Sequence, residues 1–108
     1  MLVENSEIFL KLRPLDIESI ETFYINKLRN YPKKDVIIII DFVVDKKLIF
    51  ELNKWNSYLG LTKNILVVVI DNFDIIQFNY DNLLVVPTAE EAKDYIDLEN
   101  IKRDIEKT

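Results

Sequence analysis

Four aspartates could do chemistry, because each follows an apolar run that we interpret as a strand. They are Asp41, Asp45, Asp71 and Asp74. In an open α/β sheet, ligands bind in the crevice beyond the carboxyl ends of the strands. Carboxylates gathered there can hold Mg²⁺ for phosphotransfer or hydrolysis, with Asp41, Asp71 and Asp74 as ligands. An aspartate after a strand more often caps the next helix, and Asp45 is placed to do so.

The residues that the sequence lacks exclude most other catalytic machinery. It contains no histidine and no cysteine, so Ser-His-Asp triads, thiol nucleophiles, disulfides and thiolate metal sites are all excluded. Gly60 is the only glycine, whereas phosphate-binding glycine loops need several. We therefore expect a protein that is not an enzyme and that uses no cofactor.

Charge and hydropathy limit the partners. Fourteen basic residues against nineteen acidic ones give the 108-residue chain a net charge of −5. That charge repels phosphate backbones and anionic lipid headgroups, so we expect neither nucleic acid nor a membrane as partner. The longest apolar run, 65–70, is far shorter than the roughly 20 residues of a membrane span. Positions 1–7 lack the basic start of a secretory signal, and we expect a cytoplasmic protein.

Short apolar runs rich in β-branched residues predict four strands. They cover 7–12, 35–42, 64–71 and 83–87. The two middle runs show no polar alternation, which predicts central strands covered on both faces, with the other two nearer the edges.

Segments with helical spacing alternate with these strands. One spans 17–28 and stops before Pro32, and a second spans 48–59. Asp45 is placed to cap the second, and Gly60 to supply a left-handed residue at its end. The aromatic residues on or beside these helices are expected mostly in the core: Phe23, Tyr24, Phe50, Trp55 and Tyr58. Trp55 either packs in the core, which we favour, or anchors an interface. Segment 72–82 fits either a short helical turn, which we favour, or a loop. The alternation predicts an α/β fold with a mixed sheet of four to five strands packed with helices.

The C-terminal segment predicts an acidic amphipathic helix. Thr88 and Glu91 form a T-x-x-E capping box at its start. Seven acidic residues against four basic ones give 89–108 a net charge of −3.

An apolar stripe continues beyond the part of this helix that is needed to cover a sheet. Its members are Leu98, Ile101 and Ile105. We therefore divide the chain into a domain, 1–97, and a helical extension of the same domain, 98–108. The stripe fits two interpretations. It belongs to a solvated helix stabilised by pairs such as Glu99 with Arg103, or it docks on a partner or on a second copy to form a homodimer.

The sequence resembles the STAS domain, the fold of bacterial anti-sigma-factor antagonists. The likeness lies in the element order, in the strand runs DVIIIIDF and ILVVVI around a long amphipathic helix, and in the ending LLVVPTAEEAKDYI. It spans about residues 5–97 and consists of hydrophobic pattern and spacing. The resemblance implies a compact cytosolic domain with a mixed sheet, which binds a protein partner and in its best-known members is switched by phosphorylation of a serine.

The position of that regulatory serine is occupied differently here. The resemblance places it at the start of the helix after the second central strand, where this chain reads V-D-K-K at 44–47. No serine, threonine or glycine stands between Asp41 and Trp55, so we expect no phosphoserine switch. The residues expected to contact the partner are Asp45, Lys46 and Lys47. Asp45 either mimics a permanently negative state or simply caps the helix.

We therefore expect a non-catalytic, STAS-like regulatory module that binds a protein through Asp45, Lys46, Lys47 and the exposed side of the second helix. Two alternatives remain. One is a Mg²⁺-dependent phosphotransfer or hydrolase domain. The other is an acidic inhibitor of a basic enzyme, similar to immunity proteins, whose charge would steer association.

Overall fold

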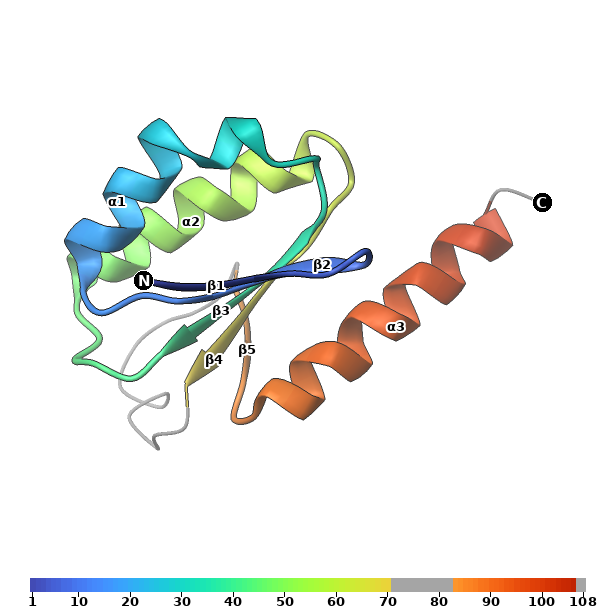
Figure 1. Ribbon diagram of the computed structural model, residues 1–108. Coiled ribbons are helices and arrows are strands. Elements are labelled where there is room, and N and C mark those ends of the chain that lie inside the picture. The colour runs from blue at the N-terminus through green and yellow to red at the C-terminus, as the bar shows by residue number, and fades with distance from the viewer. Residues whose placement is uncertain (71–82, 107–108) are drawn as a thin grey trace.

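A five-stranded mixed sheet lies between two helical layers in the computed structural model, which describes residues 1–70 and 83–106 (Figure 1). The strands are β1 (Leu2–Asn5), β2 (Phe9–Arg13), β3 (Asp35–Ile40), β4 (Leu66–Ile70) and β5 (Leu84–Val86). They are ordered β1-β2-β3-β4-β5, with β1 antiparallel to β2 and all other neighbours parallel. The predicted α/β architecture with a mixed sheet is confirmed.

Strands β3 and β4 form the centre of the molecule. Every residue of both strands is buried. Ile38 and Val68 pack into the core on one face of the sheet, whereas Ile37 and Val67 pack into the core on the other. Because successive side chains of a strand point to opposite faces, burial on both sides requires the unbroken apolar runs seen in the sequence.

Strand β1 was not predicted, and it displaces β2 from the edge of the sheet. All four residues of β1 are exposed. A tight turn joins the two strands, in which the Phe9 amide donates to the Ser6 hydroxyl at 3.0 Å and the Ser6 amide donates to the Phe9 carbonyl at 3.0 Å. The strand expected at 7–12 is therefore next to the edge strand and is not itself at the edge, whereas β5 lies at the opposite edge. Main-chain pairing with β2, and not burial of side chains, holds β1 in place.

Two helices cover one face of the sheet. They are α1 (Ile17–Asn26) and α2 (Lys46–Gly60), with a 3₁₀ turn, η1 (Leu28–Asn30), after α1. Asp16 caps α1 by accepting a hydrogen bond from the Ser19 amide at 2.8 Å. Helix α1 ends earlier than predicted, and η1 carries Leu28 into the core.

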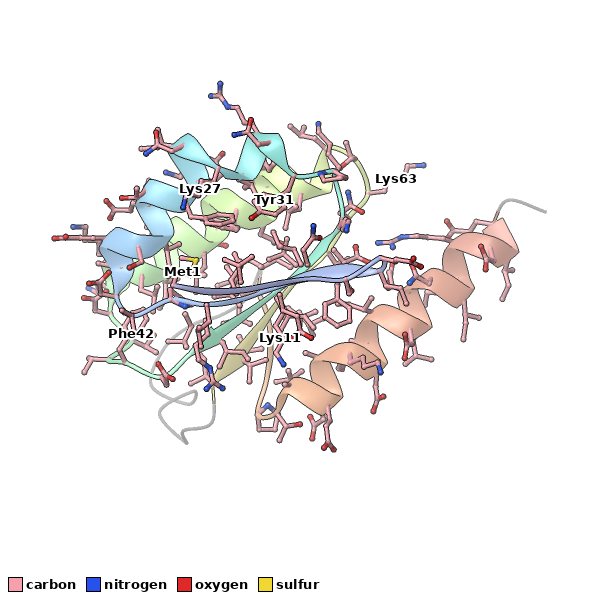
Figure 2. The ribbon with its side chains drawn as sticks, viewed as in Figure 1. Met1, Lys11, Lys27, Tyr31, Phe42 and Lys63 are labelled. Atoms are coloured by element: carbon pink, nitrogen blue, oxygen red, sulfur yellow. The ribbon has the colours of Figure 1, made fainter. Side chains whose placement is uncertain are left out.

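Aromatic rings join these two helices. Trp55, the only tryptophan, is fully buried, with ring centroids 6.0 Å from Phe23 and 5.8 Å from Tyr24. Tyr31 packs against the same core from the end of η1 (Figure 2). The prediction that Trp55 belongs to the core is confirmed.

The end of α2 differs from the prediction. Gly60 is the last helical residue and has no positive φ, whereas Lys63 has a φ of 60°. The chain therefore reverses three residues after the glycine. Hydrogen bonds from the amides of Thr62 and Lys63 to the carbonyls of Leu59 and Gly60 tighten the chain after the helix.

Helix α3 (Ala89–Glu106) covers the other face of the sheet and packs against β3, β4 and β5. Only Ala92 and Ile96 are buried in it. The structure describes one continuous helix from the capping residue Thr88, whose hydroxyl accepts from the Glu91 amide at 3.1 Å. Among the described residues, no helix has the length and apolar character needed to cross a membrane.

A buried ion pair fixes the C-terminal half of α3 to the sheet. Arg103 donates from Nη1 and Nη2 to both carboxylate oxygens of Asp35, at 2.9 and 2.8 Å. Asp35, which is only 2% exposed, also accepts from the Ile65 amide at 2.9 Å. The hydrogen bonds to Asp35 raise the pKa of Arg103 above its ordinary value. Arg103 therefore anchors the helix to the start of β3. The sequence had suggested a pair between Arg103 and Glu99, but the hydrogen bonds of Arg103 to a carboxylate go to Asp35.

Candidate functional site

The start of α2 presents the three predicted partner-binding residues. Asp45 has an extended backbone and accepts a hydrogen bond from the Leu48 amide at 2.8 Å, so its carboxylate caps the helix. Lys46 and Lys47 are exposed beside it. The ammonium group of Lys47 lies 3.7 Å from a carboxylate oxygen of Glu21, which belongs to α1.

Exposed apolar side chains accompany these lysines. Val43 is 84% exposed, Phe50 73% and Leu61 79%. Helical geometry of about 100° per residue places Lys46, Phe50 and Leu61 along one side of α2. We call the set Val43, Lys46, Lys47, Phe50 and Leu61 the α2 surface.

The α2 surface is basic. Helix α2 contains three lysines and a single acidic residue, Glu51, whose side chain is only 6% exposed and lies 3.0 Å from Lys54. A large aromatic ring beside cationic groups, away from the core, is typical of a protein-binding surface.

Phe50 is the functional candidate that the sequence analysis missed, since it was grouped with the core aromatics. Its neighbours Leu48 and Leu52 are buried at 1% and 0% exposure. A residue two positions from a buried one lies about 200° around the helix, on the solvent side. The spacing therefore contained the signal, but aromatic character alone suggested burial.

Of the three aspartates considered as metal ligands, the structure describes Asp41 alone. Asp41 is exposed after β3, with its carboxylate 4.0 Å from Nε of Arg13. Asp71 and Asp74 lie outside the described residues. Within residues 1–70 and 83–106, no three histidine, cysteine, aspartate or glutamate side chains are grouped so as to hold a metal ion.

A shallow depression follows the carboxyl ends of the parallel strands. Its lining residues are Arg13, Ile39, Ile40, Asp41, Val69, Pro87, Thr88 and Ala89. The ion pair between Arg13 and Asp41 joins side chains that are 51% and 59% exposed, so water screens it and it contributes little stability.

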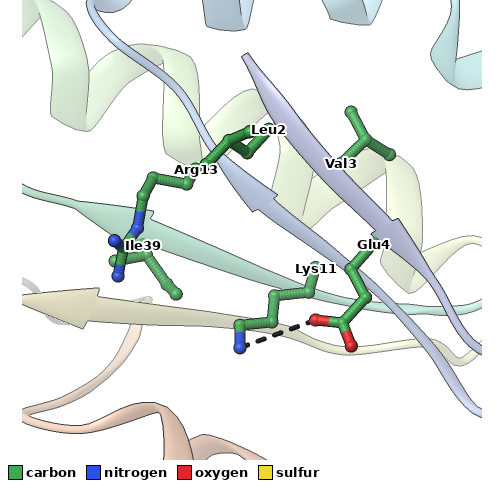
Figure 3. Close-up of a pocket in the computed structure, with 6 residues that line it drawn as sticks. All are labelled: Leu2, Val3, Glu4, Lys11, Arg13 and Ile39. Atoms are coloured by element: carbon green, nitrogen blue, oxygen red, sulfur yellow. Dashed lines mark ion pairs between the residues drawn. The ribbon is translucent and has the colours of Figure 1, made fainter.

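A second depression lies on the part of the sheet that α3 leaves uncovered (Figure 3). Leu2, Val3 and Glu4 of β1 line it together with Lys11 and Arg13 of β2 and Ile39 of β3. Glu4 and Lys11 stand opposite each other in the sheet, and their charged groups are 3.6 Å apart. The side chains of Lys11 and Glu4 are 33% and 67% exposed, so water screens this pair as well and it contributes little stability.

The outer side of α3 carries the predicted C-terminal stripe. Leu98, Ile101 and Ile105 are 58%, 56% and 67% exposed, and Tyr95 beside them is 44% exposed. Three charged residues, the acidic Glu91 and Asp94 and the basic Lys102, share this side of the helix by the same angular spacing. We call the set Glu91, Asp94, Tyr95, Leu98, Ile101 and Ile105 the α3 surface.

Two buried polar atoms between α1 and α2 have no hydrogen-bond partner among the described residues. They are Oε1 of Glu51 and Nε1 of Trp55. Both residues lie on the side of α2 that packs toward the aromatic cluster. A buried polar atom without a partner costs stability, so each of these two atoms weakens the fold.

Comparison with known proteins gives no family assignment: the sequence matches no protein-family model and no curated protein.

Proposed function

We propose that the chain is a non-catalytic, STAS-like interaction domain that binds a protein partner through the α2 surface and lacks a phosphoserine switch. The observation that carries the proposal is the start of α2. At the position where the resembling family has its regulatory serine, this chain has an exposed helix start with Lys46, Lys47 and the solvent-facing Phe50.

The chemistry of the α2 surface favours binding over catalysis. Lysine side chains bury their aliphatic stems on a partner and keep the ammonium groups hydrated, and a phenylalanine ring supplies a large apolar contact. Asp45 is engaged in capping, which holds the first turn of α2 in one conformation. A fixed helix start presents Lys46 and Lys47 with little ordering cost on binding.

The mixed sheet also supports the proposal. It has the arrangement that the STAS resemblance implies, with α2 following the central strand β3. The proposed function includes no phosphoswitch, because residues 42–54 contain no serine, threonine or tyrosine whose hydroxyl a kinase could modify.

Affinity purification from the native cell extract tests this function. The wild-type chain is expected to retain a protein that the Lys46→Glu, Lys47→Glu variant loses, because the partner then meets two negative charges in place of two positive ones. The matched control is Arg29→Glu, Lys63→Glu, which changes the net charge equally at exposed positions outside the α2 surface.

Retention of the same partner by the Lys46→Glu, Lys47→Glu variant would contradict the proposed surface. Loss of the partner from both double variants would show that net charge, and not the α2 surface, controls binding. An extract from which the wild-type chain retains no protein would contradict the proposed function itself.

A further inference from the structure

The α2 surface and the α3 surface have opposite charge. The α2 surface carries Lys46 and Lys47; Asp45 beside them caps the helix, and Glu21 lies 3.7 Å from Lys47, so Lys46 is the lysine whose charge is least offset. Exposed acidic residues surround the α3 surface: Glu90, Glu91, Asp94, Asp97, Asp104 and Glu106. Of the basic residues in α3, Arg103 is held by Asp35 at the sheet, so only Lys93 and Lys102 offset this charge.

Each surface also carries exposed apolar side chains of matching extent. Phe50 and Leu61 are eleven residues apart in the sequence, so they span about 17 Å at the helical rise of 1.5 Å per residue. Tyr95 and Ile105 are ten residues apart and span about 15 Å. The two ridges are therefore of nearly the same length.

Charge and apolar groups follow the same order along both helices. Lys46 precedes Phe50 by four residues, and Asp94 precedes Leu98 by four. When the helices lie parallel, the register that brings Lys46 near Asp94 also brings Phe50 near Leu98, and it leaves Leu61 about one turn past Ile105. Helices α2 and α3 run in the same direction across the sheet (Figure 1). Copies stacked on one another by translation would therefore place them parallel.

The two surfaces lie on opposite faces of the sheet, so they cannot meet within one molecule (Figure 1). We propose that copies of this chain associate head to tail, with the α2 surface of one copy docked on the α3 surface of the next. This contact goes beyond the proposed function, because it requires no other protein; a second copy and the partner would compete for the α2 surface. It leaves one surface free at each end, so it continues into a chain or closes into a ring.

A symmetric pair through α3 is the less favourable arrangement. It would place the acidic residues around the α3 surface against the same residues of the second copy, and like charges across an interface oppose association. The head-to-tail contact brings opposite charges together. It is limited to one helix on each side, which places it in the class of small interfaces, below about 1,200 Å², that bind weakly.

Sedimentation velocity on the full chain tests the proposal. At low ionic strength, the weight-average sedimentation coefficient is expected to rise with concentration between about 10 μM and 1 mM, the range typical of small interfaces. The rise is expected to shrink when salt is raised from about 0.05 to 0.5 M, because salt screens exposed charges.

Two single substitutions separate the surfaces. Phe50→Ser on α2 and Leu98→Ser on α3 are each expected to weaken self-association at least about tenfold, as for an apolar residue near the centre of an interface. Both positions are exposed, so neither change disturbs the core. A mixture of the two variants is expected to form a one-to-one complex, because each retains the surface that the other has lost. Ile25→Ser, at a 64% exposed position of α1, is the matched control and is expected to behave as wild type.

A charge exchange tests the register. Lys46→Glu and Asp94→Lys are each expected to weaken association by about two- to fivefold, the range for exposed charge pairs. The chain that carries both substitutions is expected to regain association, because the two changed side chains again have opposite charge across the contact. Regained association supports this register, and its failure refutes the register.

Any of three results would overturn head-to-tail association. The first is a wild-type sedimentation coefficient that stays constant up to about 1 mM, a concentration at which even a weak, small interface forms. The second is that the Phe50→Ser and Leu98→Ser variants associate as strongly as wild type. The third is that a mixture of these two variants forms no one-to-one complex. Association that Leu98→Ser abolishes and Phe50→Ser leaves intact would instead indicate the symmetric pair through α3.

Discussion

Replacing Arg103 with methionine tests how the C-terminal half of α3 is held on the sheet. The change removes a guanidinium group that makes two hydrogen bonds to the Asp35 carboxylate and one to the Lys63 carbonyl, at 2.8 to 2.9 Å. Asp35 is 2% exposed, so its charge would remain buried, with the Ile65 amide as its one remaining partner among residues 1–70 and 83–106. Arg103→Met is therefore expected to destabilise the fold strongly.

The magnitude follows from the burial of the two partners. Removing one member of a fully buried ion pair costs about 3 to 5 kcal/mol. The Arg103 side chain is 24% exposed, so water reaches the site and the lower end of that range applies, about 3 kcal/mol. In a domain of this size, such a loss lowers the melting temperature by roughly 10 to 20 °C.

Urea unfolding followed by the fluorescence of Trp55 measures this effect. Trp55 is the only tryptophan and is fully buried, so its emission reports on loss of the core. The matched control is Lys102→Met, one residue away and exposed, for which a change within about 0.5 kcal/mol is expected.

A second variant identifies the cause of the loss. If the cost arises from stranding the buried Asp35 charge, adding Asp35→Asn to Arg103→Met is expected to recover about 1 kcal/mol or more, since a neutral amide is cheaper to bury and still accepts from the Ile65 amide. A loss below about 0.5 kcal/mol for Arg103→Met, no larger than an ordinary surface change, would refute the reasoning.

Three further predictions concern α1 and α2. Asp45→Ala is expected to lower the free energy of unfolding by about 1 kcal/mol through loss of the helix cap, whereas Asp45→Asn is nearly neutral, as urea midpoints will show. Glu51→Met is expected to raise the free energy of unfolding by about 1 kcal/mol in the same assay, because it removes a buried oxygen that lacks a partner. Hydrogen bonds from Ser19 lower the pKa of Asp16 below 3.8, so its contribution is present above about pH 4 and is lost as pH falls through that lowered pKa. Asp16→Asn is expected to flatten the acid side of the stability curve measured against pH.

The features that the sequence predicted correctly depend on local pattern. Burial on both faces requires the continuous apolar runs of β3 and β4. The cap by Asp45 and the burial of Trp55 follow from position relative to a 3.6-residue repeat. Each of these can be recognised within about ten residues of chain, because the physical cause is local.

The features that the sequence did not predict depend on distant partners or on main-chain pairing. Asp35 and Arg103 are 68 positions apart, and no local pattern indicates that a strand start and a helix end will meet. Strand β1 has no buried residue, so it carries no hydrophobic signal. Phe50 was misjudged because its type outweighed its position, although a residue between two buried leucines of a helix faces solvent.

The contacts that fix α3 on the sheet also hold its exposed side in place. Thr88 caps the start of the helix, and Arg103 holds its last turns on Asp35, so Leu98 and Ile101 lie between two fixed points. A helix end without such contacts frays, and a frayed surface must be ordered before it can bind. The buried ion pair is a costly way to hold a helix for stability alone, because well-packed apolar residues would do as well. The contact also keeps the acidic, partly apolar outer face of α3 in one conformation, as the proposed head-to-tail association requires.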